Sequence, residues 1–260
     1  MSGLAPVAVC LIRDREPYSH NQFTEGLRNA GFTVTDSQCH TPRKGDVLLI
    51  WNRSGFRHHN ALRFEAAGCP VIVAENGWIG STNEGGKFYA LCRNHHNGAG
   101  TWPVGTADRL KDMNVTLNPW RESGDHILVL ASRGIGAPGV AMPRDWARQA
   151  VKGLERRTAR PVRLREHPGD SHAPIGKDIR NAHAVVTWAS GAAIKAIAAG
   201  VPAYYEMKNW IGAPAARHIT EDLEAPFLGD RLPMFQRLSW AQWSAKEIST
   251  GEPIRRLLNA

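Results

Sequence analysis

The sequence contains no hydrophobic run long enough to cross a membrane. No window reaches about 18 uninterrupted apolar residues, the length that indicates a transmembrane helix. The apolar run from Ala5 to Ile12 has no basic residue before it, so it predicts a first buried strand rather than a secretion signal. We therefore expect a globular protein with no membrane partner.

Cysteine is scarce and shows no pairing pattern. The chain has 4 cysteines, Cys10, Cys39, Cys69 and Cys92, with no Cys-x-x-Cys pair among them. Free thiols in a reducing, cytoplasmic compartment are the simplest interpretation.

A convincing set of metal ligands is also missing. His58-His59 and Cys92-x-x-His95-His96 combine suitable residue types, but adjacent side chains of a strand point to opposite faces and rarely share an ion. The sequence has no Asp-x-Asp doublet that would hold a divalent metal on a diphosphate. We expect no metal site and no tightly bound cofactor.

Positive charge is what the chain has in excess. Its formal net charge is +8, which favours a polyanionic partner such as nucleic acid or a nucleotide-bearing ligand. Hydrophobic residues make up 42% of the 260 residues, enough for folded cores. Basic side chains of the N-terminal half offer a candidate track for a polyanion: Arg53, Arg57, Lys87, Arg93, Arg109 and Lys111.

Short apolar runs alternate with amphipathic segments, which predicts parallel sheets covered by helices. The expected strands are 7–12, 32–35, 47–51, 71–74, 126–131, 162–165, 184–188 and 203–205, and the expected helices are 21–31, 60–67, 143–153 and 192–199. Residues 76–120 lack regular periodicity and are expected to be long loops that carry function, or a crossover. From Ser239 onward we expect one or two helices, with Ser239 capping the first and Trp240 and Trp243 on one face.

The linker at 118–124 divides this pattern into two halves. The predicted fold class is α/β, with two Rossmann-like, doubly wound domains, 1–120 and 121–260, facing a central cleft. Ligands of such sheets bind at the carboxyl ends of the strands.

A glycine-rich loop follows the predicted strand 126–131. Gly134, Gly136 and Gly139 have the spacing Gly-x-Gly-x-x-Gly, and glycine allows the close backbone approach that a phosphate needs. Pro138 interrupts the motif, and no acidic residue follows about 20 residues later, so the loop does not indicate NAD. An ordinary flexible loop is the alternative. Arg133 stands beside these glycines as a further candidate for binding phosphate.

Two more polar turns follow predicted strands of the second half. His167-Pro168 comes after strand 162–165, where a histidine at a strand end can donate a hydrogen bond to a phosphate oxygen. Ser190-Gly191 opens the next helix, and a helix N-terminus favours an anion. Ser190 lacks the flanking glycines of Gly-x-Ser-x-Gly, which excludes a hydrolase nucleophile of that type.

Acidic residues at predicted strand ends of the first half are candidates for a general base. Glu75 closes the strand 71–74, and Asp14, Glu16 and His20 crowd the loop after the first strand. Each of them taken singly is also compatible with a solvated loop residue.

Taken together, residues 127–202 resemble the nucleotide-binding half of GT-B glycosyltransferases. His167-Pro168 and Ser190-Gly191 are similar to the His-Pro motif and the Ser/Thr-rich turn that hold the donor phosphate in capsule-type Kdo transferases and bacterial sialyltransferases. Glu75-Asn76-Gly77-Trp78 is similar to the Glu-Asp-Gly-Phe block of the capsule-type enzymes, with Asn76 where the second acid stands.

The loop from Ala131 to Trp146, the small size and the basic charge look more like small phage-encoded glycosyltransferases. This resemblance implies a metal-independent transferase in which domain 1–120 binds the acceptor and domain 121–260 binds a nucleotide sugar, with a UDP-sugar favoured. It further implies duplex DNA with 5-hydroxymethylated pyrimidines as acceptor, and the host cytoplasm as location. Alternatives are a non-catalytic nucleic-acid-binding protein on a degenerate transferase fold, a glycan-directed glycosyltransferase and a sugar-nucleotide epimerase.

Overall fold

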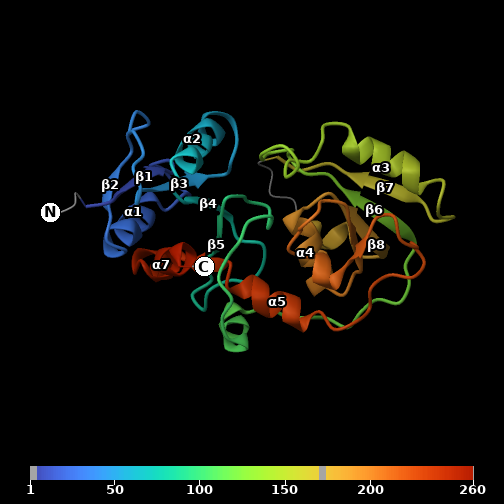
Figure 1. Ribbon diagram of the computed structural model, residues 1–260. Coiled ribbons are helices and arrows are strands. Elements are labelled where there is room, and N and C mark those ends of the chain that lie inside the picture. The colour runs from blue at the N-terminus through green and yellow to red at the C-terminus, as the bar shows by residue number, and fades with distance from the viewer. Residues whose placement is uncertain (1–4, 170–173, 260) are drawn as a thin grey trace. The chain divides into compact units, whose positions relative to one another are not determined.

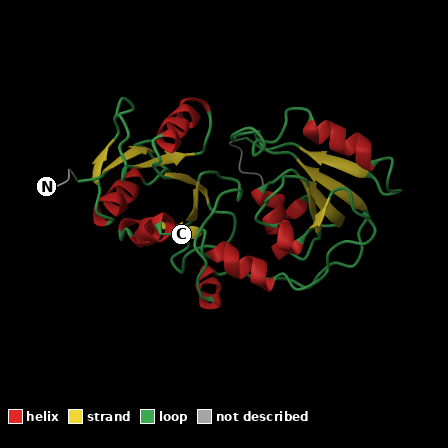
Figure 2. Ribbon diagram, viewed as in Figure 1, coloured by secondary structure: helices red, strands yellow, loops and turns green. Residues whose placement is uncertain are grey.

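The computed structural model describes residues 5–169 and 174–259, and the chain divides into two compact units. The first unit comprises the residues up to 96, residues 100–113 and the residues from 237 onward, and the second comprises residues 97–99 and 114–236. Each unit has its own sheet with helices beside it (Figures 1 and 2). The predicted mixture of parallel strands and helices is therefore confirmed.

The sheet of the first unit has six strands in the order β11-β5-β4-β3-β1-β2. Its parallel strands are β1 (Val7–Leu11), β2 (Thr33–Thr35), β3 (Val47–Trp51) and β4 (Val71–Asn76), whereas β5 (Phe88–Arg93) pairs antiparallel with β4 and with β11 (Gln242–Ser244). Helix α2 (Gly55–Ala66) packs Ala61 and Phe64 against β1, β3 and β4. The other face carries α1 (His20–Asn29) (Figure 1).

The sheet of the second unit has five strands, all parallel, in the order β10-β9-β8-β6-β7. They are β6 (His126–Leu130), β7 (Val162–Arg165), β8 (Ala182–Thr187), β9 (Ala203–Tyr205) and β10 (Arg217–His218). Helix α3 (Trp146–Leu154) packs on the face that bears Ile127 and Val129. Helix α4 (Gly191–Ala198) lies on the opposite face (Figure 1). The remaining elements of this unit include the single turns η2 (Ile175–Lys177) and η3 (Ala213–Ala215).

Residues 76–120 contain a strand that the sequence pattern did not predict. Strand β5 is almost fully buried because it lies between β4 and β11. Its run Phe-Tyr-Ala-Leu-Cys is apolar enough for a buried strand, but the surrounding Gly, Asn and His residues obscured it. The short helix η1 (Ala107–Met113) follows in the same stretch.

The C-terminal segment also differs from the prediction. Ser239 does not begin a helix; it ends α5 (Leu232–Ser239), which carries the chain back to the first unit. Trp243 lies in strand β11, and the first C-terminal helix, α6 (Ala245–Ser249), is capped by Ser244 in a capping box with Glu247. The last helix is α7 (Glu252–Leu258). A three-residue strand forms here because β5 supplies a pairing partner some 150 residues earlier in the chain, which local pattern cannot show.

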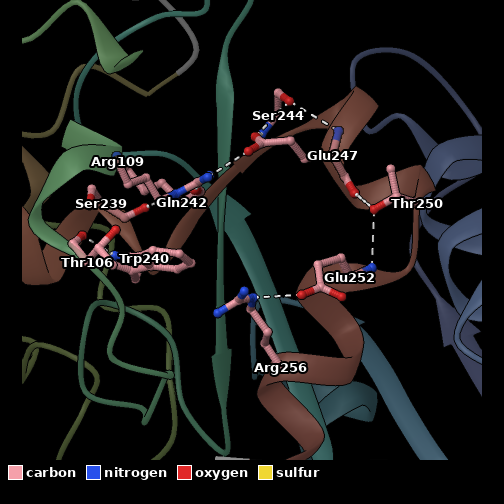
Figure 3. A network of polar contacts seen from close by, with 10 residues as sticks. All are labelled: Thr106, Arg109, Ser239, Trp240, Gln242, Ser244, Glu247, Thr250, Glu252 and Arg256. Atoms are coloured by element: carbon pink, nitrogen blue, oxygen red, sulfur yellow. Dashed lines mark hydrogen bonds and ion pairs between the residues drawn. The ribbon is translucent and has the colours of Figure 1, made fainter. Parts of the chain in front are cut away.

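Arg109 in η1 holds the C-terminal segment that returns to the first unit, residues 237–259, called the returning segment below (Figure 3). Its guanidinium donates to the Ser239 carbonyl at 2.8 Å, to the Gln242 carbonyl at 2.6 Å and to Glu247 Oε1 at 2.7 Å. The same group lies 3.9 Å from the centroid of the Trp243 ring. Arg109 was expected in a surface track, but its guanidinium makes three hydrogen bonds within the first unit. Lys111, also in η1, pairs with Asp108 at the surface.

Candidate functional site

The carboxyl ends of β6, β7 and β8 bring the predicted phosphate-binding residues to one edge of the second sheet. Because the strands are parallel and neighbours in the order β8-β6-β7, the loops that follow them emerge side by side. The chain leaves β6 toward α3 on one face and leaves β8 toward α4 on the other. The switch point, where the connections change from one face of the sheet to the other, thus lies between the carboxyl ends of the paired strands β6 and β8. Ligands of such sheets bind at this point.

The glycine-rich loop, residues 131–145, follows β6 at this switch point and leads into α3. Gly134 and Gly139 have φ angles of +64° and +83°, a region that side chains rarely tolerate. Trp188, at the end of β8, donates its indole N–H to the Val140 carbonyl at 3.0 Å and so ties the loop across the switch point. Arg133, Gly134 and Gly136 lie on the part of the loop that is exposed or half-buried.

His167 follows β7 and is exposed, with a defined tautomer. Its Nδ1 accepts a hydrogen bond from the Gly169 N–H at 3.0 Å. Since Nδ1 acts as an acceptor, the neutral ring carries its proton on Nε2, which is then a hydrogen-bond donor. Pro168 lies between the two partners in this turn. The geometry therefore suits donation to an oxyanion, which is the role that the sequence suggested.

Ser190 is the N-cap of α4, and Gly191 is the first residue of that helix. The Ser190 hydroxyl accepts from the Ala192 N–H at 3.1 Å, while the Ser190 N–H donates to Thr187 Oγ1 at 2.8 Å. The hydroxyl thus has a structural partner already, and its own hydrogen can be directed outward. The first turn of α4 faces the carboxyl edge of the sheet, where the helix dipole favours an anion.

In the first unit, the predicted base candidates gather at the corresponding edge. Strands β1 and β3 are neighbours whose chains continue to opposite faces, so the switch point lies between them. His20 begins α1 near the end of β1, and its Nδ1 contacts the Ile12 carbonyl at 2.9 Å. A carbonyl accepts only, so Nδ1 carries the proton and Nε2 is the basic nitrogen of the neutral ring. His20 and His167 therefore present opposite functions, acceptor and donor.

Glu75 lies inside β4, one residue before its end, and is half-buried. The block that follows it is anchored by the C-terminal segment. Gln242 Oε1 accepts the Trp78 N–H and, at 3.1 Å, the Ile79 N–H. Gly77, which has no Cβ, allows the chain to pass this close to Phe88, because a Cβ at that position would lie 2.7 Å from the Phe88 carbonyl oxygen. Trp78 is consequently a core residue, and Gln242 is a positioning residue that sequence spacing did not reveal.

A cavity of about 500 Å³ in the first unit is lined by three of the predicted residues, Glu16, Lys87 and Arg109. The Lys87 ammonium donates to the Pro17 carbonyl at 2.7 Å and lies over the Tyr89 ring. The Tyr89 hydroxyl contacts the Ser19 hydroxyl at 2.5 Å. Asp14 is exposed in the same loop but does not line this cavity. The volume and the mixture of acid, amine and hydroxyl groups suit a small polar ligand.

The predicted basic track is only partly at the surface. Arg53 is 3% exposed, and its guanidinium binds Glu65 at 2.6 and 2.7 Å and the Asn94 carbonyl at 2.6 Å. It therefore supports the end of β3 and presents no charge to a polyanion. Arg57 is half-buried and donates to the Leu11 carbonyl at 3.3 Å, where burial and the neighbouring Arg13 lower its pKa. Arg93 ends β5 and is half-buried.

The structure adds residues that the sequence analysis did not single out for this site. Trp146 and Trp188 meet edge to face, with centroids 6.0 Å apart, beneath the glycine-rich loop. The Trp146 indole N–H donates to Glu206 Oε2 at 2.5 Å. The pairing of these two tryptophans depends on how α3 crosses the sheet, which the sequence does not show.

Metal ligands do not cluster within residues 5–169 and 174–259. Among these residues, no group of three or more His, Cys, Asp or Glu side chains has the arrangement of a metal site. Within the same ranges, no helix combines the length and apolar character needed to span a membrane.

Comparison with known proteins shows a similarity of fold but no match of sequence. No protein-family model matches the sequence, and no curated protein matches it either. Solved structures do match. The β-Kdo 2,4-transferase of Thermosulfurimonas dismutans KpsC has a TM-score of 0.56 at 12% identity, covering 90% of each chain. The β-Kdo 2,7-transferase of the same protein has a TM-score of 0.54 at 13% identity, covering 96% of this chain and 99% of that one. At this identity the similarity concerns the fold alone.

Proposed function

We propose that this protein is a glycosyltransferase of GT-B type that moves a sugar from a nucleotide-sugar donor to a hydroxyl acceptor. The observation that carries the proposal is the carboxyl edge of the second sheet. There a glycine-rich loop, the Nε2–H donor of His167 and the N-terminus of α4 converge on a switch point. The fold similarity to two Kdo transferases supports it.

In the proposed reaction the acceptor oxygen attacks the anomeric carbon of the donor. The bond between that carbon and the leaving phosphate oxygen breaks, and the electron pair leaves with the nucleotide. His167 and the first turn of α4 stabilise the charge that develops on the phosphate. The acceptor proton passes to a base of the first unit, for which Nε2 of His20, Glu75, Glu16 and Asp14 are the candidates.

The donor and the acceptor are the finer parts of the proposal. A nucleotide-activated Kdo and UDP-sugars are the first donors to test, since the structural neighbours are named as Kdo transferases and the sequence resemblance favours UDP. DNA carrying hydroxymethylated pyrimidines remains a candidate acceptor on the grounds of net charge alone. The burial of Arg53 weakens that candidate, and the cavity beside Glu16 favours a small polar acceptor such as a glycan end.

The experiment is a nucleotide-release assay on the full chain with CMP-, UDP- and GDP-activated sugars, and with glycan or modified-DNA acceptors. We expect one donor to give release that depends on an acceptor. His167→Ala should lower kcat/KM about 100-fold or more, the usual effect of losing a charge-stabilising donor. His59→Ala changes an exposed histidine of α2 and should leave the rate within about twofold.

Two outcomes would contradict the proposal. If His167→Ala turns over as fast as the parent protein, the carboxyl edge of the second sheet is not the donor site. If no donor is turned over while DNA binds, the non-catalytic nucleic-acid-binding alternative replaces the transferase. Loss of that DNA binding with added salt would then identify phosphate contacts as its source.

A further inference from the structure

A second concave site lies on the second unit, along the open edge of its sheet. Strand β7 is the edge strand, and its Arg163 and Arg165 pair in register with Leu128 and Leu130 of β6. Residues paired in this way point to the same side of a sheet, which here is the side away from α3. The segment from Lys177 to Asn181 forms the opposite wall, and the groove has a volume of about 490 Å³.

The groove is strongly basic. Its one acidic residue, Asp178, is already neutralised by Arg165, whose Nε lies 2.6 Å from Asp178 Oδ2. Arg163, Lys177 and Arg180 are exposed and make no ion pair within the described parts of the chain. Three positive charges therefore converge on one groove without counter-charges.

A buried histidine closes the inner end of the groove. His126 is 3% exposed, lines the groove, and neither of its ring nitrogens has a hydrogen-bond partner within the described residues. Burial, and then the charge of Arg163, lower the pKa of His126; the Asp178 backbone lies close enough to oppose them in part, but not in hydrogen-bond geometry with either ring nitrogen. A buried, unpartnered imidazole is costly, and a ligand oxygen in the groove would satisfy its N–H.

The wall of the groove is held in place by the fold. The Arg121 guanidinium donates to the carbonyls of Ile179 and Ala182 at 2.7 and 2.8 Å. The Asp125 N–H donates to the Asn181 carbonyl at 2.8 Å, and Ile179 is buried in the unit. The three cations are thus carried by a supported wall and a sheet strand, as in a preformed site.

We propose that this groove binds the phosphate of a small phosphorylated ligand, at a site separate from the carboxyl edge where the donor is proposed to bind. Its volume is in the range of small-molecule sites, and Leu128 gives it an apolar surface beside the cations. His126 begins β6, so it lies about 13 Å along that strand from the glycine-rich loop. The inference goes beyond the transferase activity and does not depend on it.

The test follows the His126 ring signals by NMR in the full chain during titration with inorganic diphosphate, CMP and UDP. His126→Gln identifies the signals. We expect a saturable shift with diphosphate, and affinity about tenfold weaker in Arg163→Gln, because a charge-assisted hydrogen bond is lost. Arg148→Gln removes the same charge from an exposed position on α3, on the other face of the sheet, and should change the affinity less than about twofold.

His167→Ala should leave the shift of His126 intact, which separates this groove from the donor site. The proposal is overturned if the His126 signals do not move, or if Arg163→Gln and Arg148→Gln weaken binding equally. It is also overturned if only an oligonucleotide, and none of the three small probes, moves the signals, since the ligand would then be a nucleic-acid chain. If His126→Gln fails to fold, comparison of Arg163→Gln with the parent spectrum still decides the outcome.

Discussion

Two histidines carry opposite chemical functions because their backbone partners differ. Nδ1 of His20 faces a carbonyl, and Nδ1 of His167 faces an N–H. We predict that, at a pH where both rings are neutral, ¹⁵N NMR shows the Nδ1–H tautomer for His20 and the Nε2–H tautomer for His167. The same tautomer at both positions would remove the assignment of one as base candidate and the other as phosphate donor.

Trp188 connects β8 to the glycine-rich loop through a single hydrogen bond. Trp188→Phe keeps an aromatic ring against Trp146 but removes the N–H that the Val140 carbonyl accepts. We expect a loss of about 1 kcal/mol in the free energy of unfolding, together with weaker nucleotide binding. Urea unfolding and a nucleotide titration measure the two effects.

Trp120→Phe is the matched control for this change. Its indole N–H donates to the Gly229 carbonyl at 2.8 Å, also within the second unit but at an exposed position. It should leave nucleotide affinity unchanged. Equal loss of affinity in both variants would mean that the loop does not depend on its link to Trp188.

At the scale of elements, two helical glycines have opposite roles. Gly26 in α1 lies against α6, and a Cβ there would lie 2.1 Å from the Ile248 carbonyl oxygen. Gly153 in α3 faces open space, since a Cβ at that position would have no heavy atom within 4 Å. We predict that Gly26→Ala destabilises the protein by roughly 1–3 kcal/mol through overpacking, whereas Gly153→Ala stabilises it by about 0.4–1 kcal/mol. Thermal unfolding of both variants shows whether each substitution raises or lowers the stability. Stabilisation by Gly26→Ala would contradict the contact between α1 and α6.

The returning C-terminal segment depends on a charged contact that responds to pH. Burial alone would raise the pKa of Glu247, but hydrogen bonds from Arg109 and Ser244 outweigh it and hold the pKa below its ordinary value of 4.5. A carboxyl whose pKa is lowered by folding stabilises the protein at pH values above its ordinary pKa. This stabilisation is lost as the pH falls through the pKa of the folded state. Glu247→Gln should therefore destabilise the protein at pH 7, and the difference from the parent should narrow below pH 4.5.

Glu155→Gln, at the exposed end of α3, is the control for that pH series. Urea midpoints of the parent, Glu247→Gln and Glu155→Gln proteins are compared from pH 7 to acidic conditions. A constant difference for Glu247→Gln across the whole range would show that its carboxylate does not titrate differently in the folded protein.

The sequence predicted the elements whose signal is local. Strands β3 and β7 begin and end at the predicted residues: β3 is a continuous buried apolar run and β7 alternates apolar and basic residues, and turn residues bound both. Helix α2 was predicted too short: it begins at Gly55, where Ser54 ends the extended chain. Strand β11 and the anchoring of Trp78 by Gln242 could not be predicted, because both depend on residues far apart in the chain.

The same distinction holds for the candidate site. The positions of His167 and Ser190 after strands could be predicted, because each follows its own strand directly in the sequence; their role stays a prediction. The burial of Arg53 and the use of Arg109 inside the first unit were missed, because a sequence does not reveal which cations have carboxylate and carbonyl partners. The net charge therefore did not predict which basic side chains are available to bind a polyanion.

For the whole molecule, the proposed function requires nucleotide binding by the second unit and a general base from the first. Each unit contributes a switch point with polar loops, and neither alone has both a phosphate donor and a base among the candidate residues. The fold similarity to the two Kdo transferases is consistent with this division.

The most direct test is the melting temperature of the full chain with CMP, UDP, GDP and their sugar conjugates, measured in parallel for the parent protein and His167→Ala. A ligand that binds the folded state raises the melting temperature by mass action. We predict that one nucleotide raises it in the parent protein and raises it much less in His167→Ala. No rise with any nucleotide, or equal rises in both proteins, would contradict the donor site at the carboxyl edge of the second sheet.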